Sequence, residues 1–146
     1  MKPIDIYIAK ALTLAIVIMV MQLLLSYPAV VIYSVLIAPP GQSEGSYAAA
    51  AMQVITWWAR IGGTVMFFFA GWLFTGRQRT RNAYAFVAAM CGWYLLLELV
   101  GFVFLGEIAR FFTSAVAPWI APQFVAGFLG VLVARRTLPA NEQPIP

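Results

Sequence analysis

Four long apolar stretches, separated by short polar segments, constrain the fold of this chain more than any other feature. A membrane hydrocarbon core about 30 Å thick is crossed by roughly 20 apolar residues in helical form. The stretches cover residues of about 11–38, 47–75, 82–105 and 118–134. The sequence therefore predicts an all-α fold, a bundle of four transmembrane helices, with Ser46 as the N-cap of the second.

The composition agrees with a membrane protein and removes most enzyme classes. Of the 146 residues, 63% are hydrophobic and 10% are charged, whereas soluble domains have about 45–50% and about 25%. The chain has no histidine and a single cysteine, Cys91, so Ser–His and Cys–His catalysis, haem and most zinc sites are not expected. We also find no glycine-rich phosphate loop and no catalytic carboxylate pair. We therefore expect no enzyme, no catalytic residue, no metal and no cofactor.

The first apolar stretch has two interpretations. Lys2 and Lys10 lie just before this stretch, where a signal peptide also has basic residues. However, an apolar run of about 27 residues is much longer than the roughly 7–15 of a signal peptide. We interpret it as a retained signal-anchor, and a cleaved signal peptide is the alternative.

The distribution of basic residues predicts the orientation in the membrane. Cytoplasmic segments of membrane proteins carry an excess of Lys and Arg. Seven of the nine basic residues lie in the N-terminus, the second loop and the tail: Lys2, Lys10, Arg77, Arg79, Arg81, Arg135 and Arg136. An even number of spans then places both termini in the cytoplasm, and a bacterial-type inner membrane is the expected location.

The basic second loop suggests contact with lipid headgroups. Arg77, Arg79 and Arg81 lie in a loop of about six residues that is tied to the membrane at both ends. The topology rule accounts for these residues, and each basic residue near an anionic surface contributes about 1 kcal/mol of attraction. We therefore expect the lipid bilayer as a partner and no nucleic acid.

The remaining segments add no second domain. Residues 1–136 are expected to form a single transmembrane domain, and residues 137–146, with three prolines, a disordered cytoplasmic tail. Between the third and fourth stretches, residues 106–114 favour a short amphipathic helix at the interface, with Glu107 and Arg110 three positions apart.

Two ionisable residues, Arg60 and Glu98, fall inside the predicted spans. A charge at the bilayer centre costs at least about 2.5–3.5 kcal/mol, so such residues usually have a partner. Each lies 16 residues, or about 24 Å of helix, from the predicted cytoplasmic end of its span. We expect the second and third spans to be antiparallel neighbours. The equal depths then predict an Arg60–Glu98 ion pair. This pair either has a structural role, holding the two helices together, or is part of a binding site.

Further polar residues follow helical spacing around this pair and predict a polar seam inside the bundle. They come from all four spans: Gln22, Gln53, Thr56, Tyr94 and Gln123. In the fourth span, the small residues Ala126, Gly130 and Ala134 recur every four positions, a pattern that allows helices to approach closely.

Two functions remain open. The small size and the absence of enzymatic equipment favour a non-enzymatic accessory or interaction subunit of a membrane assembly, with another membrane protein or a second copy of the chain as partner. The alternative is a small oligomeric transporter or channel that uses Arg60 and Glu98.

Overall fold

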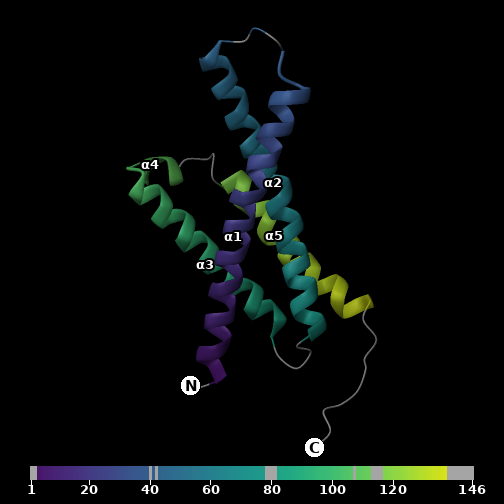
Figure 1. The fold of residues 1–146 in the computed structure, drawn as a ribbon. Coiled ribbons are helices and arrows are strands. Elements are labelled where there is room, and N and C mark those ends of the chain that lie inside the picture. Colours follow the sequence, from purple (N-terminus) through teal and green to yellow (C-terminus); the bar gives the residue numbers. More distant parts are fainter. Residues whose placement is uncertain are drawn as a thin grey trace, which may run out of the picture.

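The computed structural model describes residues 3–39, 41, 43–77, 82–106, 108–112 and 117–137, and within them it contains helices joined by turns and no strand. The elements, shown in Figure 1, are α1 (Pro3–Leu36), α2 (Glu44–Arg77), α3 (Ala83–Phe104), α4 (Ile108–Phe111) and α5 (Ala117–Thr137). Within these residues, α1, α2 and α3 are long and apolar enough to cross a membrane. The predictions of an all-helical fold and of membrane-crossing helices are confirmed to this extent.

The first connection shows how α1 stops and α2 starts. Gly41 has a φ of 83°, a left-handed conformation that glycine adopts without steric cost. Ser43 then caps α2, because its hydroxyl oxygen accepts a 3.4 Å hydrogen bond from the backbone nitrogen of Ser46. The prediction of Ser46 as the N-cap is therefore wrong: α2 begins at Glu44, and Ser46 lies in its first turn.

The first two helices are longer than a membrane is thick. Each has 34 residues, or about 51 Å at the usual helical rise, against a hydrocarbon core of about 30 Å. The end of the α1–α2 hairpin consequently extends past α3 and α5 (Figure 1).

The closest approach between helices is that of α2 and α5. A Cβ atom at Gly71 would overlap the backbone carbonyl of Gly127, and one at Gly130 would overlap the carbonyl of Phe68. Ala126 and Ala134 of α5 are buried as well. The close helix contact expected from the small residues of the fourth span is therefore present, and α2 is the neighbour.

The helices that pack against α2 differ from the expected ones. The second and third spans were expected to lie side by side, but α2 packs mainly against α5 and α1, and α3 packs mainly against α1. The reason is steric, since the glycines of α2 and α5 allow their backbones to touch. Direct contact between α2 and α3 is small.

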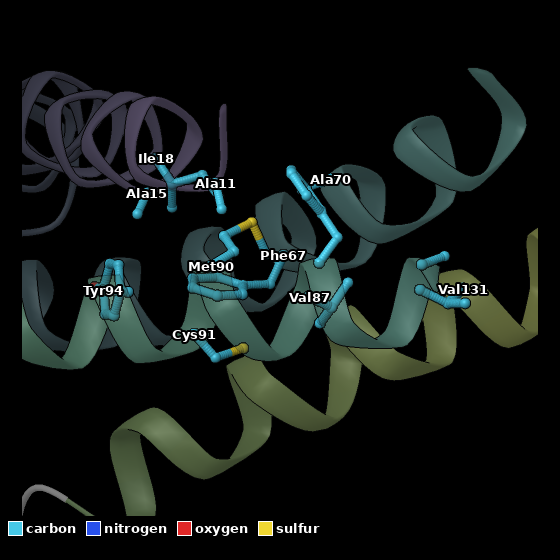
Figure 2. Close-up of a cluster of buried hydrophobic side chains, with 12 residues drawn as sticks. Ala11, Ala15, Ile18, Phe67, Ala70, Val87, Met90, Cys91, Tyr94 and Val131 are labelled. Atoms are coloured by element: carbon cyan, nitrogen blue, oxygen red, sulfur yellow. The ribbon is translucent and has the colours of Figure 1, made fainter. Parts of the chain in front are cut away.

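A cluster of buried apolar side chains joins the four long helices (Figure 2). Ala15 of α1, Phe67 of α2, Met90 of α3 and Val131 of α5 all belong to it, and each is fully shielded from solvent. Nearby, the rings of Phe74 and Phe86 are stacked with their centroids 3.4 Å apart.

One end of the bundle brings together the start of α1, the end of α2, the start of α3 and the end of α5. We call it the terminal end. The Tyr7 hydroxyl on α1 donates a 2.7 Å hydrogen bond to the backbone carbonyl of Asn82 beside α3. The guanidinium carbon of Arg135 on α5 lies 4.6 Å from the ring centroid of Tyr84 on α3. Lys10 and Arg136 also belong to these helix ends.

Candidate intramembrane binding site

A cavity of about 790 Å³ lies between α1, α2, α3 and α5. This volume is within the range of small-molecule binding sites, about 300–1,000 Å³. All seven residues assigned to the ion pair or the polar seam line it: Gln22, Gln53, Thr56, Arg60, Tyr94, Glu98 and Gln123. The structure thus brings together residues that are up to about a hundred positions apart in the sequence.

The cavity lies in the half of the bundle opposite the terminal end. Glu98 precedes the last residue of α3, Phe104, by six positions, and Gln123 follows the first residue of α5, Ala117, by six. Both side chains are therefore attached about 9 Å below the ends of these helices. Phe102 and Ile120 line the cavity still nearer to those ends.

Two buried glutamines form the polar floor of the cavity. Gln22 is 7% exposed and Gln123 is 4% exposed. The Tyr94 hydroxyl donates a 2.8 Å hydrogen bond to Oε1 of Gln22, and Nε2 of Gln123 donates a 3.3 Å hydrogen bond to the carbonyl of Ala59. Among the described residues, Nε2 of Gln22 and Oε1 of Gln123 have no hydrogen-bond partner. Within the described residues, these buried amides therefore have one unused donor and one unused acceptor.

Gly63 allows both amide groups to rest against the backbone of α2. A Cβ atom at this position would lie 2.5 Å from Nε2 of Gln22 and 2.6 Å from Nε2 of Gln123. These atoms are the flexible ends of side chains, so a larger residue at position 63 displaces the amides without forcing the helices apart. The neighbouring Gly62 differs, because its Cβ atom would meet only the ring of Trp58, at 3.7 Å.

The two charged residues reach the cavity from different helices. Arg60 belongs to α2 and Glu98 to α3, and both side chains are half-buried. The guanidinium carbon of Arg60 lies 5.3 Å from the ring centroid of Trp57, at a distance typical of cation–π contacts. The Arg60–Glu98 ion pair itself stays a prediction.

The apolar part of the cavity was not identified from the sequence. Met52 and Trp57 line it and are themselves 63% and 60% exposed, so the wall continues onto the outer surface of α2. Helical spacing could have identified Trp57 from the sequence, because it lies three residues before Arg60 and therefore on the same face of the helix.

The other predicted features lie at the edges of the described structure. Arg77 is the last residue of α2, whereas Arg79, Arg81 and the tail after Thr137 lie outside the described residues. The α4 turn falls within the segment expected to form a short interfacial helix, of which residues 107, 113 and 114 also lie outside. The described residues hold no group of three metal-ligating side chains.

Comparisons with models of protein families, with curated proteins and with solved structures found no match to this chain. The function is consequently argued from the cavity and from the arrangement of the helices.

Proposed function

We propose that this chain is a four-span, multi-pass protein of a bacterial-type inner membrane with both termini in the cytoplasm. As the fourth span, α5 has 21 residues, or about 31 Å of helix, which suffices to cross the hydrocarbon core. The basic residues Lys10, Arg135 and Arg136 belong to the terminal end, and the excess of positive charge on cytoplasmic segments supports this orientation. Residues 1–136 then form one membrane domain, followed by a cytoplasmic tail of residues 137–146.

Within this topology, we propose that the protein is a small transporter that binds a polar group in the cavity. The observation that carries the proposal is the pair of buried glutamine atoms without hydrogen-bond partners, Nε2 of Gln22 and Oε1 of Gln123. Leaving such an atom unsatisfied costs about 1–3 kcal/mol, and the hydrocarbon region supplies no water to replace the missing bond. We infer that a ligand in the cavity supplies the missing hydrogen bonds.

Arg60 and Glu98 give this cavity charges of both signs. Ionisable residues inside a membrane usually face a cavity or a partner and often mark a substrate path. Because the two side chains come from α2 and α3, which have little direct contact, relative movement of these helices would change the cavity without breaking the glycine contact between α2 and α5.

An accessory subunit is the second candidate, and the α1–α2 hairpin is the observation that favours it. The apolar span of α1 runs over 30 residues, Tyr7–Leu36, or about 45 Å, which exceeds the hydrocarbon thickness. Near its end, Val35 and Leu36 are 74% and 76% exposed. Another membrane protein or a second copy of the chain would cover these side chains.

Native mass spectrometry of the protein purified in mild detergent tests both candidates. For a transporter we expect a small-molecule adduct, on a monomer or a self-oligomer, without a foreign subunit. The compound released from the adduct should then cross the membrane of liposomes containing the wild type, and this flux should be lost with Glu98→Gln. A stoichiometric foreign subunit would support the accessory role, and a protein with no adduct, no partner and no flux would overturn both.

A further inference from the structure

The depth and the opening of the cavity bear on the class of ligand that it accepts. On α5 it reaches from Gln123 to Ile120, which are attached about 9 Å and about 4.5 Å below the start of that helix, and on α3 it reaches from Tyr94 to Phe102, about 15 Å and about 3 Å below the end. In the proposed topology, this places its outer part at or just beneath the headgroup region of the leaflet opposite the termini, because headgroups begin where the hydrocarbon core of about 30 Å ends.

The wall of the cavity is open toward the membrane. Met52 and Trp57, which line the cavity, are mostly exposed on the outer surface of α2. In a bilayer this surface faces lipid. A ligand with an apolar tail can therefore place its polar head among the glutamines while its tail stays in contact with the membrane.

The polar groups at the cavity fall into two complementary sets. Arg60 and Nε2 of Gln22 are donors, and they suit the oxygens of a phosphate. Glu98 and Oε1 of Gln123 are acceptors, and they suit an ammonium group that still carries N–H bonds. Donors and acceptors of both kinds line the same cavity of about 790 Å³. A head with only a negative charge would leave the acceptor set unused.

We propose that the cavity binds the headgroup of a phospholipid that carries a primary amine next to its phosphate, taken from the leaflet opposite the termini. This inference rests on the proposed binding role of the cavity and specifies its substrate class. The phosphate binds Arg60 and Gln22, and the ammonium group binds Glu98 and Gln123. Full methylation of the amine removes its N–H bonds and therefore abolishes the hydrogen bond to Gln123.

The test is native mass spectrometry of the full chain in nanodiscs that contain equal amounts of phosphatidylethanolamine, phosphatidylcholine and phosphatidylglycerol with identical acyl chains. We expect phosphatidylethanolamine to be retained about tenfold more than phosphatidylcholine, since tenfold corresponds to about 1.4 kcal/mol, close to the strength of one hydrogen bond to a charged group. Retention should fall with each methyl group added to the amine.

A matched pair of variants locates the effect. Gln123→Leu removes one of the two acceptors and should weaken the preference for the primary amine. Thr13→Val removes an exposed hydroxyl of α1 that bonds the carbonyl of Ala9 and does not line the cavity, and it should preserve the preference. The wild-type methylation series decides the question even if Gln123→Leu fails to fold.

The outcomes separate this inference from the broader proposal. Equal retention of phosphatidylethanolamine and phosphatidylcholine, or a preference for phosphatidylglycerol, would overturn the headgroup assignment. Binding of soluble glycerophosphoethanolamine without retention of the lipid would overturn the membrane as the source. Retention of another small molecule, with no lipid preference, would overturn this inference and leave the proposed function standing. Absence of any adduct would overturn both.

Discussion

The hydroxyl of Tyr94 on α3 donates a 2.8 Å hydrogen bond to Oε1 of Gln22 on α1. Both residues are buried, at 2% and 7% exposure, and the bond joins two helices deep in the bundle. It holds the carbonyl side of the Gln22 amide and so leaves the amide nitrogen as the unused donor. The same contact thus joins two helices and orients a group of the proposed binding site.

Removing this hydrogen bond should lower stability measurably. In a double-mutant cycle of Tyr94→Phe and Gln22→Leu, we expect a coupling energy of about 0.6 kcal/mol, with about 1.7 kcal/mol as the upper end for membrane proteins. Thermal unfolding in detergent provides the measurement. Tyr27→Phe is the control, because the Tyr27 side chain is 75% exposed. A coupling energy of zero would contradict the role given to the bond.

The glycine contact between α2 and α5 should tolerate no side chain. We expect Gly71→Ala to destabilise the protein by about 1–3 kcal/mol, the usual cost of overpacking, because its Cβ atom would overlap the backbone of Gly127. Gly92→Ala on α3 is the matched control, since a Cβ atom there meets nothing within 4 Å. Equal unfolding temperatures for the two variants would show that α2 and α5 do not pack in this way.

Much of this architecture could be predicted from the sequence, because membrane spans leave a strong signal. Runs of apolar residues and the prolines and glycines between them located the long helices to within a few residues at most ends. The largest error is the start of α1 at Pro3, eight residues before the expected Ala11. Helical spacing also grouped the polar residues, and all of them line one cavity.

The pairing of the helices could not be predicted, because a short loop between two helices does not require them to pack against each other, and α2 packs mainly against α5 and α1. The small residues of α5 indicate a close contact, and Gly71 lies near the polar face of α2, but the sequence does not show that these two surfaces meet. Likewise, the role of Gly63 depends on two glutamines from other helices reaching the same point. Such a convergence is a property of the tertiary structure alone.

The Arg60–Glu98 ion pair makes a distinct prediction. Glu98→Ala should destabilise the protein by about 2.5–3.5 kcal/mol, because the charge of Arg60 would lose its carboxylate inside the membrane. Exchange of the two residues, Arg60→Glu with Glu98→Arg, should restore part of the loss. Chemical unfolding of the single and exchanged variants is the measurement, and equal stability of all of them would exclude the pair.

The proposed orientation can be tested by labelling with a membrane-impermeant thiol reagent in intact cells. In a Cys91→Ala background, we expect Ser43→Cys, which lies between α1 and α2, to be labelled from outside. Thr137→Cys, at the end of α5, should be labelled only after the membrane is permeabilised. Both side chains are exposed. The opposite pattern would place the termini outside, and labelling of both from outside would remove the fourth span.

The central claim is that the two buried glutamine amides form the floor of a site that holds a polar ligand. The most direct test compares Gly63→Ala with Gly62→Ala, since a Cβ atom at Gly63 displaces both amides while one at Gly62 makes an ordinary contact with Trp58. We predict that native mass spectra show the small-molecule adduct on the wild type and on Gly62→Ala. The adduct should be lost from Gly63→Ala, although that variant still unfolds cooperatively. An adduct that persists unchanged on a folded Gly63→Ala protein would contradict the account.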